Sequence, residues 1–349
     1  DILDRAKAQF EGASRDPRDY EGACALGRLS WLSGSPERAV EPLQLSIQRN
    51  RSHGESRHAL ARVYLALAKP TDSLAQAEAW AAEAPSSATA QKDIALAQAQ
   101  QGKWKEAEAA VSRSLKLEPQ DAESHRLRAT LLFARGDGRG GFAELQKANT
   151  LAPKDSEVFC AIGRAFARQG NVPQAQKAYQ AAVREEPASV CGLVGDVLLK
   201  PAAGKPQMSK LQGLSSAAPR ATDRALAAVA WSRVALAAGR VQDARHGAEL
   251  ALELQPFLSD AALAEGLVLR RMRDEVKARE ALIRAVQLDP SDGPARLALA
   301  DAYAAGGDTD VKRAYEEYVN FTRLAPKSPD MARVKKLLPA LKKRAARAP

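Results

Sequence analysis

The sequence predicts an all-α protein built from repeated pairs of short helices. In residues 88–121, small and apolar side chains fall at helical spacing in two runs. Gly102 separates the two runs, and Pro119 ends the second. The pattern returns every 34 residues, since the small residue Ala95 has equivalents at Gly27, Ala61, Ala129 and Gly163 and, after one extra residue, at Ser232, Gly266 and Ala300. Pro119 likewise returns as Pro85, Pro153, Pro187, Pro256 and Pro290.

The second helix of each pair has its own recurrent small residue. Its positions are Ala39, Ser73, Ala107, Gly141, Ala175, Ala244 and Ala278. Small side chains at one place on each helix allow neighbouring helices to approach closely. This pattern resembles the tetratricopeptide repeat family over nearly the whole chain. The resemblance implies a right-handed α-solenoid of about eight recognisable repeats, one degenerate repeat and a C-terminal capping helix.

The repeat frame divides the chain into five parts. Residues 1–19 are expected to form a partial repeat or an N-terminal capping helix, and residues 20–189 repeats one to five. Residues 190–224 are a degenerate repeat or joint, residues 225–326 are repeats six to eight, and residues 327–349 form a basic capping helix. Because the chain lacks an initiating Met and starts inside a repeat, we expect a fragment of a longer protein or a processed chain.

Two places interrupt the regular pattern. Repeat four carries Gly136, Gly138, Gly140 and Gly141 around its turn, and each glycine inside a helix costs roughly 1 kcal/mol. We therefore expect this turn to be the softest part of the first half. The slot at 190–224 contains Pro201, Gly204 and Pro206, which break its helical periodicity. Sequence drift or a functional loop would each explain that slot.

Composition restricts the cellular setting only loosely. No apolar run approaches the ~18 residues of a membrane helix. Cys24, Cys160 and Cys191 follow no pattern, which argues against a disulfide framework and fits a reducing compartment. We therefore expect a cytoplasmic protein, with the periplasm after removal of a signal peptide as the alternative.

Positive charge is concentrated at the end of the chain. Nine Lys and Arg residues face one Asp between residues 323 and 349, while the whole chain has a net charge of +10. Met331, Val334, Leu337, Leu338 and Leu341 keep helical spacing. One face can therefore cover the last repeat while the other is basic. The basic tail residues are Lys335, Lys336, Lys342, Lys343 and Arg344.

The sequence contains no pattern that indicates catalysis. It has no glycine-rich phosphate loop, no GxSxG, no HExxH and no CxxC pair, and its four histidines have no metal-ligand spacing. We therefore expect no enzyme, no cofactor, no metal site and no small-molecule substrate.

The family resemblance implies a binding surface. In tetratricopeptide proteins the first helix of each repeat lines a concave groove that binds partner segments. Carried over position by position, the candidate groove residues are Arg28, Trp31, His58, Arg62, Lys92, Arg126, Arg164, Arg168, Arg233, Leu263, Leu267 and Arg270. The first half of this groove is basic and the second is mainly aliphatic, which favours an acidic and apolar protein segment or the surface of another protein.

The predicted function is a non-enzymatic protein–protein interaction scaffold. The Ala, Arg and Leu bias suggests a bacterial source, and by analogy an assembly or regulatory factor of an envelope, secretion, pilus or motility machine. Two other interpretations stay open. Long cations also keep an Ala-rich surface soluble, and the basic tail could act as an adaptor for nucleic acid or peripherally for an anionic membrane. Nucleic acid is the less favoured partner, because aromatic residues are few.

Overall fold

The computed structural model describes residues 18–346 except residues 34, 219, 308 and 309. These residues form nineteen α-helices and one 3-10 helix, and they contain no strand. The predicted helix over residues 1–19 lies almost wholly outside the described residues.

The chain forms two compact units, and the boundary falls within α8, after Leu131. Unit 1 comprises residues up to 131, and residues 218–222 group with it; unit 2 comprises residues 132–217 and 223 onward. The sequence placed a joint at 190–224, whereas the structure divides the chain beside the glycine-rich turn of repeat four.

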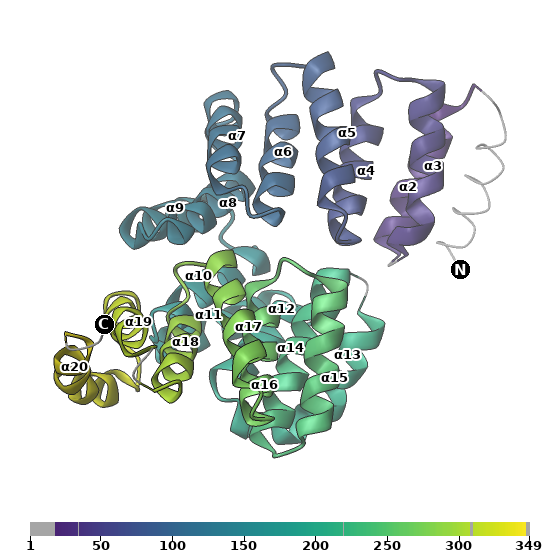
Figure 1. The fold of residues 1–349 in the computed structure, drawn as a ribbon. Coiled ribbons are helices and arrows are strands. Elements are labelled where there is room, and N and C mark those ends of the chain that lie inside the picture. The colour runs from purple at the N-terminus through teal and green to yellow at the C-terminus, as the bar shows by residue number, and fades with distance from the viewer. Residues whose placement is uncertain (1–17, 34, 219, 308–309, 347–349) are drawn as a thin grey trace. The chain divides into compact units, whose positions relative to one another are not determined.

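Unit 1 is a row of antiparallel helix pairs (Figure 1). Its helices are α2 (Tyr20–Leu32), α3 (Pro36–Arg49), α4 (Gly54–Ala66), α5 (Pro70–Glu83), α6 (Ala88–Gln100), α7 (Trp104–Leu117) and the first part of α8 (Ala122–Ala134).

Unit 2 continues the alternation of first and second helices. Its helices are α9 (Gly138–Leu151), α10 (Ser156–Arg168), α11 (Val172–Glu185), α12 (Val190–Leu199), the 3-10 helix η1 (Pro201–Gln207), α13 (Met208–Ala217), α14 (Ala221–Ala237), α15 (Val241–Leu254), α16 (Ser259–Arg271), α17 (Glu275–Leu288), α18 (Gly293–Ala305), α19 (Val311–Leu324) and α20 (Met331–Ala345). Pro201 and Pro206 lie in η1, so the degenerate slot has a short first helix and an irregular connection.

The helix ends follow from local chemistry. Side chains at N-caps accept hydrogen bonds from the first-turn N–H groups, as Asp155 does from Glu157 and Asp292 from Ala295. The turn within a pair needs a residue in the left-handed region, where glycine is favoured. Gly102, Gly136, Gly170, Gly239 and Gly307 supply it, and Ala68 and Arg273 adopt the same conformation with φ of 58° and 65°. The recurrence of glycine at this turn is therefore a backbone requirement.

The predicted small residues lie where two helices of a pair cross. Ala95 is fully buried, and a Cβ added to Gly163 would lie 2.6 Å from Tyr179 Cε1. A Cβ at Gly27 or Gly266 would meet the side chain of the second helix at a similar distance. The predicted close approach of helices at these small residues is therefore confirmed.

At the end of the chain, α20 covers the core of the last repeat. Val334 and Leu341 are buried against a cluster that includes Tyr318 and Phe321. Leu337, which the sequence placed on the same apolar face, is exposed. None of the described helices is long and apolar enough to span a bilayer.

Within unit 2, two segments far apart in the sequence meet in what we call the closing contact: residues 168–171 against residues 325–328, with α18 beside them (Figure 1). The backbone N–H of Lys327 donates to the carbonyl oxygen of Gln169 at 3.3 Å. Gly170 lies so close to Ser328 that an added Cβ would be 2.5 Å from its Cα. The closing contact therefore joins the turn between α10 and α11 to the segment between α19 and α20.

Candidate partner-binding groove

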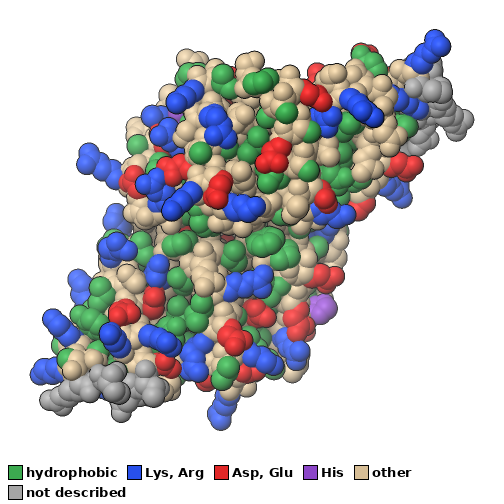
Figure 2. Space-filling model, turned by 45° about the horizontal axis from the view of Figure 1, so that its top comes forward, with side chains coloured by type: hydrophobic (Ala, Val, Ile, Leu, Met, Phe, Trp, Pro, Cys, Tyr) green, Lys and Arg blue, Asp and Glu red, His purple; other side chains and the backbone are tan. Residues whose placement is uncertain are grey.

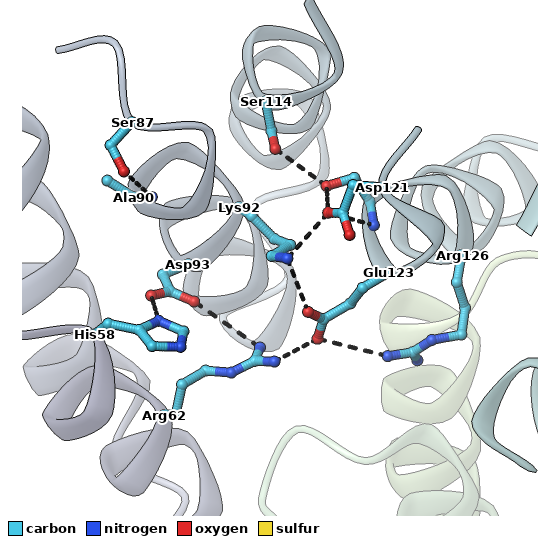
Figure 3. A network of polar contacts seen from close by, with 11 residues as sticks. His58, Arg62, Ser87, Ala90, Lys92, Asp93, Ser114, Asp121, Glu123 and Arg126 are labelled. Carbon is cyan, nitrogen blue, oxygen red and sulfur yellow. Dashed lines mark hydrogen bonds and ion pairs between the residues drawn. The ribbon is translucent and has the colours of Figure 1, made fainter. Parts of the chain in front are cut away.

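In unit 1, the first helices α4, α6 and α8 are joined by a network of charged side chains (Figure 3). Arg62 Nη2 donates to Glu123 Oε1 at 2.5 Å. Lys92 Nζ lies 3.0 Å from Asp121 Oδ2 and 3.1 Å from Glu123 Oε2. Arg126 lies further away, 3.7 Å from Glu123. Glu123 thus forms ion pairs with cations on three successive first helices.

His58 extends this network toward the start of the unit. Its Nδ1 is 2.6 Å from Oδ2 of Asp93, which is fully buried. Arg62 Nη1 is 3.9 Å from the other oxygen of Asp93. The side chains of Arg62, Asp93 and Glu123 therefore form one connected group.

The pKa values of Glu123 and Lys92 are both shifted by the opposite charges beside them. Burial alone would raise the pKa of Glu123, but the charges of Arg62 and Lys92 outweigh it and lower that pKa to about 2. The pKa of Lys92 is raised, because Glu123 and Asp121 together outweigh its burial. Glu123 and Lys92 are therefore both charged at neutral pH.

This pairing corrects the interpretation of the first half of the groove as basic. Arg62 and Lys92 are half-buried and neutralised by carboxylates that the sequence reasoning left out. Arg28, whose side chain is 55% exposed, pairs with Glu55. Trp31 packs against the core cluster of the first repeats. Figure 2 shows acidic and basic side chains interspersed over the visible face. In the described part of unit 1, Arg28, Arg62 and Lys92 are therefore each paired with a carboxylate.

The groove of unit 2 contains a partly open cavity of about 300 Å³. Its walls come mainly from the first helices α10, α12, α14, α16 and the start of α18. Its polar side chains include Arg164, Arg168, Arg233, Asp260 and Asp292, and its apolar wall includes Ala167, Val194, Leu198, Leu199, Leu226 and Leu263. Four of the candidate groove residues, Arg164, Arg168, Arg233 and Leu263, are brought together here.

The arginines of this cavity differ in their pairing. Arg168 forms an ion pair with Asp289. Within the described chain, Arg233 makes no direct hydrogen bond or ion pair, and burial lowers its pKa despite the more distant Asp260 and Asp292. Burial, together with the neighbouring carboxylates of Asp289 and Asp260, raises the pKa of Asp292. Arg233 is thus the cation of the cavity whose guanidinium remains available to a ligand.

The other two candidates in the second half, Leu267 and Arg270, lie outside the cavity. Leu267 is half-buried and packs against the core cluster of the last repeats. The Nε of Arg270 is buried without a hydrogen-bond partner among the described residues.

The sequence reasoning missed two kinds of residue. One is the set of acidic partners, although a spacing of 27 residues separates Arg28 from Glu55 and Arg233 from Asp260 and could have indicated them. The other is the disulfide between Cys160 and Cys191, whose Cα atoms are 6.1 Å apart. The sequence argued against a disulfide framework, but adjacent first helices bring the side chains of these two cysteines together. No group of three His, Cys, Asp or Glu residues suited to a metal ion occurs in the described ranges.

Comparisons with known proteins agree with this architecture. A family model described as tetratricopeptide repeat matches residues 58–122, 92–156 and 160–190. Among curated protein sequences, none matches. One similar solved structure is TTC0263, a thermophilic TPR protein from Thermus thermophilus, with 18% identity and a TM-score of 0.48 over 52% of this chain and 98% of that one.

Two further structures show the range of the similarity. Yeast Tom70 has 14% identity and a TM-score of 0.38 over 98% of this chain and 93% of its own. YrrB, whose structure is described as a TPR protein with an unusual peptide-binding site, has 15% identity and a TM-score of 0.37 over 54% of this chain and 97% of its own. The family model therefore identifies residues 58–156 and 160–190 as tetratricopeptide repeats, within a series of helix pairs that is interrupted at the 3-10 helix η1.

Proposed function

We propose that this chain is a non-enzymatic scaffold that binds a segment of a partner protein in the cavity of unit 2. The tetratricopeptide fold in general is a protein–protein interaction scaffold. The observation that carries the finer proposal is the cavity itself, in which Arg233 lies near the apolar side chains of Leu226 and Leu263.

The partner segment is inferred from this chemistry. A carboxylate of the partner would pair with Arg233, and an adjacent aliphatic side chain would bury apolar surface against Leu226 and Leu263. Because Arg62 and Lys92 of unit 1 are already paired with carboxylates, an acidic segment would gain less binding free energy from them. Unit 2 therefore replaces the first half of the groove as the proposed site.

Co-purification from native cells, followed by mass spectrometry, tests the proposal. Arg233→Gln removes the charge, Arg233→Lys retains it, and Lys177→Glu changes an exposed cation on α11 outside the cavity. We expect proteins captured by the parent chain to be lost with Arg233→Gln and retained with the other two variants, all with unchanged circular dichroism. Equal capture by Arg233→Gln would remove the cavity from consideration.

The biological setting is inferred from composition and from the disulfide. The Ala, Arg and Leu bias supports a bacterial protein, and we propose a role in assembling or regulating an envelope, secretion, pilus or motility machine. For location, the Cys160–Cys191 disulfide supports the periplasmic alternative over the cytoplasm, because disulfides persist in oxidising compartments. Fractionation of native cells, followed by immunodetection, tests the location.

A second candidate function rests on α20. Its exposed Lys335, Lys336, Lys342 and Lys343 have no ion-pair partner among the described residues, which suits an anionic membrane surface or nucleic acid. Lys342→Glu with Lys343→Glu should abolish salt-sensitive binding to phosphatidylglycerol vesicles or to duplex DNA, and should leave capture through the cavity unchanged. If neither vesicles nor DNA bind the parent chain, this candidate fails.

A further inference from the structure

The Cys160–Cys191 disulfide joins the first helices of two successive repeats, α10 and α12. Its two sulfurs differ in their surroundings. Cys160 is fully buried, with its sulfur 3.8 Å from the hydroxyl of Ser189. Cys191 retains 6% of its surface and lines the cavity of unit 2. A small molecule in the cavity can therefore reach Cys191, while the helices cover Cys160.

Arg164 lies directly beside the accessible sulfur. Its Nη1 is 3.4 Å from Sγ of Cys191, and its side chain also lines the cavity. A guanidinium at this distance stabilises a thiolate relative to a thiol, and the thiolate is the reactive form in disulfide exchange.

The position of Cys191 in the repeat also favours a negatively charged group beside Arg164. Arg164 and Cys191 are 27 residues apart, and the same spacing relates Arg28 to Glu55 and Arg233 to Asp260. In those two pairs the arginine faces a carboxylate from the start of the next first helix. In the repeat frame, the position of Cys191 is occupied by a carboxylate in several other repeats, including Glu55, Glu123, Glu157 and Asp260.

We propose that Cys191 and Cys160 form a redox-active pair, in which Cys191 exchanges with a small carboxylate-bearing thiol that enters the cavity. The cavity volume of about 300 Å³ is at the lower end of the range for small-molecule sites, roughly 300–1,000 Å³. Arg233 also lines this cavity, and its guanidinium can pair with the carboxylate of that thiol.

The exchange proceeds in two balanced steps. The thiolate of the small molecule attacks Sγ of Cys191, a new S–S bond forms, and the bond to Cys160 breaks, so that the electron pair leaves on Cys160 and a proton from water follows. A second molecule of the thiol then attacks the sulfur that the first molecule contributed to the mixed disulfide. The bond to Cys191 breaks, and Cys191 leaves as a thiolate beside Arg164. Overall, two thiols become one disulfide, and the protein disulfide becomes two thiols.

Glutathione is a suitable probe for the intact protein. The folded parent chain is treated with reduced glutathione, quenched in acid, alkylated and digested, and the cysteine peptides are identified by mass. We expect the mixed disulfide on Cys191 and an alkylated thiol on Cys160. Glutathione on Cys160, or reduction only after the chain unfolds, would overturn the proposal. This outcome does not depend on the partner protein, so the scaffold proposal can stand or fall separately.

A variant series tests the role of Arg164. In Cys160→Ser, Cys191 should react with an aromatic disulfide such as dithiobis(nitrobenzoate), and Cys24, which is also buried but does not line this cavity, is the internal control. Adding Arg164→Gln should slow this reaction about tenfold at neutral pH and move its pH profile upward, whereas Arg164→Lys should retain most of the rate. An unchanged pH profile in Arg164→Gln would show that the arginine does not act on Cys191. If Cys160→Ser fails to fold, the glutathione experiment on the parent chain still decides the assignment.

Discussion

Replacing Glu123 by Gln should destabilise unit 1 more than any exposed charge substitution. The change keeps the size of the side chain but removes the negative charge that Arg62 and Lys92 share. Only 25% of the Glu123 side chain is exposed, so water cannot replace the lost partner efficiently. Arg62 would keep Asp93 at 3.9 Å, and Lys92 would keep Asp121 at 3.0 Å.

The magnitude follows from the lowered pKa of Glu123. Its carboxyl pKa falls from 4.5 to about 2 in the folded chain, and at about 1.4 kcal/mol for each pKa unit the charge contributes roughly 3 kcal/mol. Because the folded pKa is the lower one, this stability is fully present above pH 4.5 and is lost as the pH falls through about 2. The difference between parent and Glu123→Gln should therefore be about 3 kcal/mol at pH 7 and should vanish near pH 2.

Urea denaturation followed by circular dichroism and tryptophan fluorescence measures the effect. Three of the four tryptophans, Trp31, Trp80 and Trp104, report on unit 1. Glu78→Gln on α5, an exposed site, is the matched control and should shift the midpoint little. A Glu123→Gln midpoint equal to that of the parent at pH 7, or a difference that persists unchanged to pH 2, would refute the reasoning.

Three further predictions concern the repeat frame. Gly163→Leu should cost about 1–3 kcal/mol or more in thermal denaturation, because its side chain would overlap Tyr179; a variant that melts like the parent would contradict the packing described. Arg273→Gly should stabilise the chain by about 0.5–1 kcal/mol in urea denaturation by relieving its left-handed backbone, and no gain would indicate an unstrained turn. Residues 202–221 should exchange amide hydrogens faster than α6, α10 and α16, and uniform protection would argue against a joint there.

The sequence was sufficient to predict the fold because the repeat imposes the same steric demand many times. Positions such as Ala95 and Gly163 accept only small side chains at each helix crossing, so they recur at a fixed period. The turn position of Gly170 recurs because the backbone there must be left-handed. The requirement for a small side chain and the requirement for a left-handed backbone both arise within one repeat and its neighbour. They therefore appear in the sequence as a periodic pattern.

The candidate site was less predictable because charge pairing depends on distances between repeats. The arginines of the groove were visible in the sequence, but whether Arg62 meets a carboxylate depends on how far α4 lies from α8. The pairing of Cys160 with Cys191 and the contact of Gly170 with Ser328 depend in the same way on three-dimensional proximity. No period in the sequence reports these two contacts, whereas the 27-residue spacing from Arg28 to Glu55 was visible in it.

The closing contact between Gln169–Gly170 and Lys327–Ser328 changes how unit 2 is expected to fold. In an open repeat array, stability is a sum of nearest-neighbour terms, and terminal repeats can fray independently. Here the last repeats are tied to a turn far earlier in the chain, which raises the contact order and adds an entropic cost of loop closure before that contact forms. Unit 2 should therefore fold more slowly than an open array of equal length and should unfold as one cooperative block.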